Sequence, residues 1–132
     1  DVKMLMQAKS GDEGSTVVAV KHGEHSLLFT GDMNASRERL LNNLEHYDVL
    51  KVAHHGSKYS SNMKFLEQVQ PKVAVISVGA GNRYGHPHTE TLERLASVGS
   101  AVLRTDELGA IKVTFDDEGI KCYSYVYNPK NF

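Results

Sequence analysis

Residues 48–57 read DVLKVAHHGS, a short aliphatic run that ends in two adjacent histidines, a glycine and a serine. The run at 49–53 has the length and the β-branched content of a buried strand. In sheets that are covered by helices, ligands bind beyond the carboxyl ends of the strands. Residues 48–57 therefore predict a strand that delivers His54 and His55 to the edge of a sheet.

Two other segments share this design, in which an apolar strand runs into polar residues. The strand predicted at 26–30 leads to Asp32, and the strand predicted at 73–78 leads through a glycine-rich loop to His86. If the three strands are neighbours in one sheet, their carboxyl ends meet at the same edge. We therefore expect Asp32, the histidine pair and His86 to converge.

The remaining chain alternates strands with helices, which predicts an α/β fold with helices packed on one face of a mixed sheet. Thr89 is the expected N-cap of the last helix, and Gly99 is expected just beyond its end. The predicted helices cover residues 35–45, 62–70 and 89–98. The other predicted strands cover residues 4–8, 16–21, 101–104, 110–115 and 120–127, with a solvated acidic turn at 116–119.

The composition predicts one soluble domain spanning residues 1–132. Hydrophobic residues make up 40% and charged residues 23%, close to the globular average, and no run approaches the roughly 20 apolar residues that span a bilayer. A single cysteine, Cys122, excludes an internal disulfide and a multi-cysteine zinc site. The formal net charge of −1 does not support broad phosphate binding through lysine and arginine alone, whereas a bound divalent metal would supply local positive charge.

A carboxylate combined with imidazoles is a donor set that suits zinc and, less tightly, manganese or iron. The candidate ligands are Asp32, His54 and His55, with His86 kept as a further candidate. Each residue also has an ordinary interpretation. Asp32 would cap a helix that begins near residue 35, and the histidines would be exposed loop residues.

Two cations follow the histidine motifs closely. Lys58 comes directly after the HHGS segment, and Arg83 precedes His86 by three residues. Either side chain would bind a substrate phosphate, or would be an ordinary solvated surface charge.

Four segments in order resemble the metallo-β-lactamase-like domain of the ComEC family of late-competence DNA-uptake proteins, and related secreted hydrolases carry similar motifs. These segments are residues 27–32 (LLFTGD), 48–57 (DVLKVAHHGS), 71–79 (PKVAVISVG) and 82–88 (NRYGHPH). The likeness extends over nearly the whole chain.

The resemblance implies a four-layer αββα sandwich with a two-metal hydrolase site, holding zinc or manganese, at the sheet edges. It implies that Asp32 bridges the metals and that one of His54 and His55 is a further ligand, without saying which. The other histidine and His86 would contact the substrate or protonate its leaving oxygen, and Lys58 and Arg83 would bind its phosphates. The implied substrate is DNA or another phosphodiester; lactamase, thioesterase and phosphocholine esterase substrates remain alternatives.

The superfamily signature H-x-H-x-D-H does not occur in these residues. We therefore expect a truncated domain, the carboxyl-terminal half of the sandwich, which alone binds metal weakly or not at all and is inactive. Its uncovered apolar sheet face would pair with the missing amino-terminal half or with a second copy. The parent would be membrane-associated, with this domain outside the cytoplasm, or secreted. The alternative function is a non-catalytic module that binds DNA or a protein partner.

Overall fold

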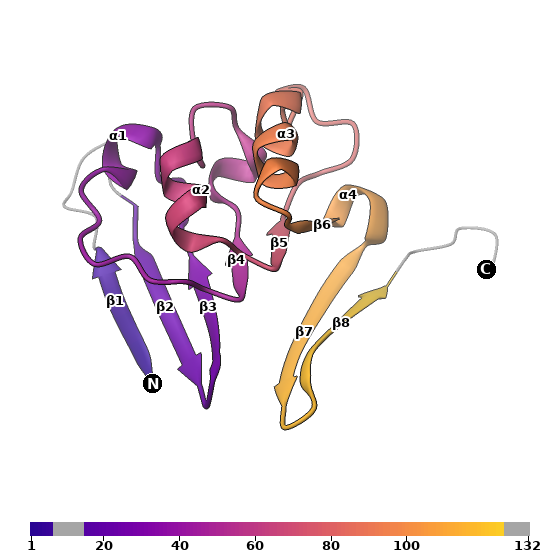
Figure 1. Cartoon of the computed structure of the whole chain (residues 1–132). Helices are drawn as coiled ribbons and strands as arrows, with labels where there is room; N and C mark the ends of the chain where they lie inside the picture. Colours follow the sequence, from indigo (N-terminus) through magenta and orange to yellow (C-terminus); the bar gives the residue numbers. More distant parts are fainter. Residues whose placement is uncertain (7–14, 126–132) are drawn as a thin grey trace.

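Six strands form one mixed sheet in the computed structural model, which describes residues 1–6 and 15–125 (Figure 1). Their order across the sheet is β1-β2-β3-β4-β5-β6. The first three strands are antiparallel, and β3 to β6 are parallel. The strands are β1 (Val2–Met6), β2 (Val17–His22), β3 (His25–Phe29), β4 (Val49–Lys51), β5 (Val73–Ile76) and β6 (Ala101–Arg104).

The three strands that precede the candidate ligands are neighbours in this sheet. Leu28 of β3 pairs with Leu50 of β4, and Leu50 pairs with Ala74 of β5, all in parallel register. The loops that follow β3, β4 and β5 therefore leave the same edge, as the sequence predicts.

The helices α1 (Ala35–Glu38), α2 (Met63–Val69) and α3 (Thr89–Ser97) gather on one side of this sheet (Figure 1). The predicted mixed sheet with helices on one face is confirmed. Strand residues that point toward the helices are buried in one core with apolar residues of α2 and α3. This core includes Leu28, Leu50, Ala74, Ile76, Phe65, Leu66, Val69 and Leu95.

The opposite face of the sheet is apolar and only partly covered. Val2, Met4 and Phe29 lie on it and are 73%, 55% and 42% exposed. A short helix, α4 (Thr105–Leu108), leads to a separate two-stranded sheet of β7 (Ala110–Asp116) and β8 (Gly119–Tyr125). Strand β7 and the large sheet line a common groove, to which they contribute Ile111, Val113, Leu27, Phe29 and Val75.

The helix predicted at 35–45 is wrong in length, because α1 ends at Glu38. Asn43 has a left-handed backbone, with φ 58°, which a helix does not tolerate. Leu40 is 56% exposed, whereas Leu41 and Leu44 pack against the core. Leu41 and Leu44 therefore pack from an irregular segment, and the three leucines do not form one face of a helix.

Other predicted elements are confirmed with small corrections at their ends. The hairpin of β2 and β3, helix α2, and the β7–β8 hairpin with its acidic turn form as expected. Thr89 is not the N-cap of α3; His88 occupies that position, and its side chain makes no capping hydrogen bond to the helix. Residues 7–8 and 126–127 of two predicted strands lie outside the described residues.

Among the described residues, no helix is both long enough and apolar enough to cross a membrane.

Candidate active site

The histidine pair occupies an unusual backbone conformation directly after β4. A 3-10 segment, η1 (Ala53–Gly56), contains His54 at φ 49°, ψ 45° and His55 at φ 55°, ψ 25°. Left-handed geometry at a residue other than glycine costs on the order of 1–3 kcal/mol and concentrates at functional sites, where the surroundings enforce it. Two consecutive residues of this kind mark the segment as one that the fold holds in place.

The loop after β3 is bonded to this segment. Thr30 Oγ1 donates to the carbonyl of Lys51 at 2.7 Å, and the His54 amide donates to the carbonyl of Gly31 at 3.0 Å. Asp32, the next residue, is therefore held beside the histidine segment, with its own side chain exposed. Burial lowers the pKa of the Lys51 amine, and the negative charge of Asp32 opposes that shift.

Asp32 does not cap α1. The N-cap is Asn34, whose side-chain oxygen accepts a hydrogen bond from the Arg37 amide at 3.2 Å. The capping interpretation of Asp32 is wrong, because the helix begins too late for Asp32 to reach its first free amides. Asp32 therefore does not stabilise that helix by capping it.

The end of the loop after β5 and the start of α3 dock against the residues that directly follow the histidine pair. The His88 amide donates to the carbonyl of Gly56 at 3.0 Å, and the Lys58 amide donates to His88 Nδ1 at 2.9 Å. At Gly56, a Cβ atom would lie 2.5 Å from the Cβ of Pro87, so only glycine permits this approach. Thr91 Oγ1 also donates to the carbonyl of Ser57 at 3.0 Å.

The imidazole rings form a cluster in which His86 is central. Its ring centroid lies 5.7 Å from that of His54, 6.3 Å from that of His55 and 4.8 Å from that of His88. His54 and His55 are exposed, and His86 is half-buried. The predicted convergence of these loops is confirmed, although the chemical role of each residue stays a prediction.

Hydrogen bonds fix the orientation of two of the rings. His55 Nδ1 lies 2.7 Å from the carbonyl oxygen of Ser77, which can only accept, so Nδ1 carries the proton and the neutral ring keeps a free lone pair on Nε2. His88 has the reverse arrangement, because its Nδ1 accepts from Lys58. His55 is therefore suited to bind a metal or accept a proton, and His88 is suited to donate to an oxygen.

Burial and the neighbouring imidazoles His88, His54 and His55 lower the pKa of His86 below its ordinary value of 6.5. At neutral pH this ring is therefore uncharged. A neutral imidazole can accept a proton or act as a ligand, whereas a protonated one can do neither.

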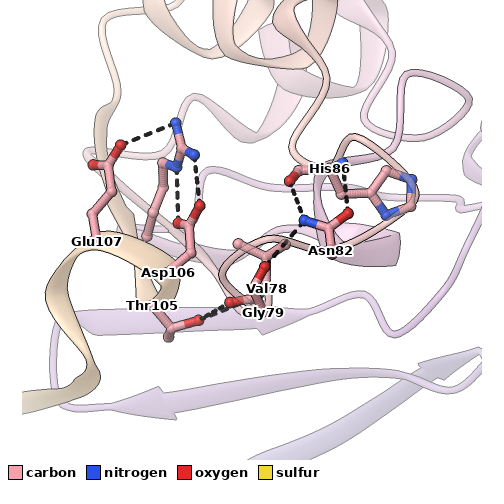
Figure 2. A network of polar contacts seen from close by, with 8 residues as sticks. Val78, Gly79, Asn82, His86, Thr105, Asp106 and Glu107 are labelled. Carbon is pink, nitrogen blue, oxygen red and sulfur yellow. Dashed lines mark hydrogen bonds and ion pairs between the residues drawn. The ribbon is translucent and has the colours of Figure 1, made fainter.

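Asn82 shapes the loop that carries His86 (Figure 2). Its Nδ2 donates to the carbonyls of Gly79 and His86 at 3.1 and 2.7 Å, and its Oδ1 accepts from the amides of Tyr84 and His86 at 3.1 and 3.0 Å. Asn82 is not among the residues that the sequence predicts for the site. The sequence feature that could have indicated its role is an asparagine in a glycine-rich loop, because asparagine side chains hydrogen-bond to the nearby backbone in turns.

The start of this loop is anchored to α4 (Figure 2). Thr105 Oγ1 accepts from the amide of Val78 at 2.8 Å and donates to its carbonyl at 2.9 Å. Arg104 forms ion pairs with Asp106 at 2.7 Å and with Glu107 at 3.2 Å in the same turn. Elements on both sides of the loop therefore limit its movement.

Residues 9–80, more than half of the chain, match the family described as Metallo-beta-lactamase superfamily. The chain belongs to this superfamily. It is 41% identical over 109 residues to ComE operon protein 3 of Bacillus subtilis (strain 168), covering 80% of the chain. Recombination protein 2 of Haemophilus influenzae is 41% identical over 81% of the chain, and Competence protein ComA of Neisseria gonorrhoeae is 36% identical over 89%.

The chain spans only 14% of the length of the first two relatives and 18% of the third. Members of the superfamily are typically hydrolases that bind divalent metals. In residues 1–6 and 15–125, no group of three or more His, Cys, Asp or Glu side chains is arranged to hold a metal ion. Asp32 and the oriented ring of His55 are donors of the right chemical type, but two such donors do not make up a complete ligand set.

Proposed function

We propose that this chain is the carboxyl-terminal part of a metal-dependent phosphodiesterase domain that cleaves DNA during competence-related uptake. The observation that carries the proposal is the meeting of three strand-end loops, which brings the histidine cluster beside Asp32. One relative, Competence protein ComA, is named for competence, and another, Recombination protein 2, is named for recombination. These names favour DNA over the other substrates that superfamily members hydrolyse.

The residues of this chain would have distinct roles in the hydrolysis of a phosphodiester. Divalent metals, when bound, would activate a water and neutralise phosphate charge. Asp32 and one of His54 and His55 would hold them, with the remaining ligands supplied by an H-x-H-x-D-H segment. The neutral ring of His86 is suited to handle the proton of the reaction, and the charges of Lys58 and Arg83 would bind the flanking phosphates.

We propose further that the parent is membrane-associated, with this domain outside the cytoplasm, or secreted. The partly covered sheet face, which carries Val2, Met4 and Phe29, would receive the amino-terminal half of the domain or a second copy of the chain.

The test is a nuclease assay with manganese or zinc on this chain joined to an H-x-H-x-D-H segment. We expect Asp32→Ala to lower DNA hydrolysis by about two orders of magnitude or more, because the site would lose a ligand. His22→Ala, at the end of β2 away from the cluster, is the control and should leave the rate unchanged. An unchanged rate of hydrolysis after Asp32→Ala would contradict the role of Asp32 as a metal ligand.

The second candidate is a non-catalytic module that binds DNA or a partner. The lack of an H-x-H-x-D-H segment in the sequence and of a metal-holding group in residues 1–6 and 15–125 favours it. The joined protein separates the two functions: DNA binding without hydrolysis at any concentration of manganese or zinc supports the module, and metal-dependent hydrolysis rejects it.

A further inference from the structure

Two exposed tyrosines lie on the loops that carry the histidine cluster, each with its own cation. Tyr59 is 68% exposed, and the Lys58 Nζ atom lies 5.4 Å from the centroid of its ring. Tyr84 is 64% exposed, and the Arg83 Cζ atom lies 5.3 Å from its centroid. The two cation–tyrosine pairs stand on the two loops that meet at Gly56 and His88.

The backbone under Tyr59 is held rigidly. Its carbonyl accepts from the Ala35 amide at 2.9 Å, and its amide donates to Ser57 Oγ at 3.3 Å. Arg94 Nη2 donates to the carbonyls of Lys58 and Ser60 at 3.0 and 3.2 Å, on either side of Tyr59. Because the backbone of this loop is already fixed, a ligand that contacts the exposed ring of Tyr59 does not have to order the loop when it binds.

The ring of the second tyrosine, Tyr84, contacts the histidine cluster. The ring of Tyr84 stacks on that of His86, with centroids 5.7 Å apart and planes 25° apart. Its amide donates to Asn82 Oδ1, the same atom that accepts from the His86 amide. A flat ligand that stacked on Tyr84 would therefore extend a row of rings that ends in the cluster.

We infer that Tyr59 and Tyr84 are stacking platforms for unpaired nucleobases on either side of the phosphate at the histidine cluster. The inference rests on the proposed function and names its substrate class as single-stranded DNA. A base in a duplex has both faces covered by its neighbours, whereas an unpaired base can stack on an aromatic side chain. In residues 1–6 and 15–125, no carboxylate pairs with Lys58 or Arg83, so neither charge is neutralised and both are available to the phosphates that join such bases.

The experiment measures binding in EDTA, so that it does not depend on hydrolysis. The probes are a fluorescently labelled 12-nucleotide oligo(dT), an abasic oligomer of the same length and a duplex of the same length, titrated with the 132-residue chain in an anisotropy assay. We expect the chain to bind oligo(dT) more tightly than either other probe. Tyr59→Ala and Tyr84→Ala should each weaken oligo(dT) binding about tenfold, the effect of losing one stacked base.

Three controls separate stacking from loss of structure or charge. Tyr59→Phe and Tyr84→Phe keep the ring and should bind as the unchanged chain does. Tyr123→Ala removes a 48% exposed tyrosine with Lys112 5.9 Å from its ring, on β8, and should have no effect. The abasic probe should bind the two alanine variants and the unchanged chain equally.

The inference is overturned if the alanine variants bind oligo(dT) as well as the unchanged chain does, if they lose abasic and oligo(dT) binding alike, or if the duplex binds best. If binding in EDTA depends on the bases but the joined protein does not hydrolyse DNA, the role of the two tyrosines is supported and only the proposed catalytic function is rejected.

Discussion

At the scale of single residues, the junction of the two histidine loops depends on Gly56. Its φ of 83° and the 2.5 Å approach to Pro87 leave no space for a side chain. We expect Gly56→Ala to destabilise the fold by about 2–4 kcal/mol, from backbone strain and overpacking together. Urea unfolding measures this loss.

Gly85→Ala is the matched control for that measurement, because Gly85 also has a left-handed φ, 71°, but nothing lies within 4 Å of its would-be Cβ. This variant should lose only about 1–2 kcal/mol, the cost of the conformation alone. Equal losses in the two variants would show that the contact with Pro87 contributes nothing.

Asp48 is a second residue whose contribution to the stability of the fold depends on its surroundings. Burial would raise the pKa of its carboxyl, but hydrogen bonds from Lys72 and Ser26 outweigh that effect and hold the pKa below 3.8. A carboxylate with a lowered pKa stabilises the folded state above its unfolded pKa, and the contribution is lost as the pH falls through the folded-state value.

We therefore expect Asp48→Asn to lower the free energy of unfolding by about 1–3 kcal/mol near pH 6, with the difference shrinking below about pH 3.8. Urea unfolding from pH 2 to 7 measures it. Glu45→Gln is the control, because Glu45 pairs with Lys21 in solvent and its loss should change little. A difference for Asp48→Asn that stays constant with pH would contradict this account.

At the scale of elements, the four-residue helix α1 is too short to be stable alone, so its contacts must hold it. The buried carboxylate of Glu38 accepts hydrogen bonds from the amide of Ser61 and from the amide and side chain of Asn62, at the start of α2. This carboxylate joins α1 to α2 and fixes the loop that presents Tyr59.

We expect Glu38→Ala to destabilise the fold by about 2–4 kcal/mol, because it leaves buried amides without an acceptor. Thermal unfolding measures this loss. Glu67→Ala, at an exposed position of α2, removes the same side chain and should have little effect. A Glu38→Ala variant as stable as Glu67→Ala would show that α1 is held by its apolar contacts alone.

At the scale of the whole molecule, the apolar face opposite the helices predicts association. Because β7 and β8 leave Phe29 42% exposed on the same sheet face as Val2 and Met4, we expect the purified chain to self-associate in a concentration-dependent way. Phe29→Lys should shift the equilibrium toward monomer in sedimentation velocity experiments. Leu40→Lys, at a 56% exposed position outside this face, is the control and should not. A monomer at all concentrations would contradict the prediction.

The sequence by itself determined the elements that local pattern controls: the aliphatic strands, the β2–β3 hairpin, and the polar residues placed directly after β3, β4 and β5. Because parallel strands end at one edge, that order predicted that the histidine loops meet if the three strands are neighbours, and only the tertiary structure established that they are. Only the tertiary structure decided the early end of α1, the left-handed His54 and His55, and the tautomers of His55 and His88. Each of these depends on contacts between residues far apart in the chain, which no local pattern records.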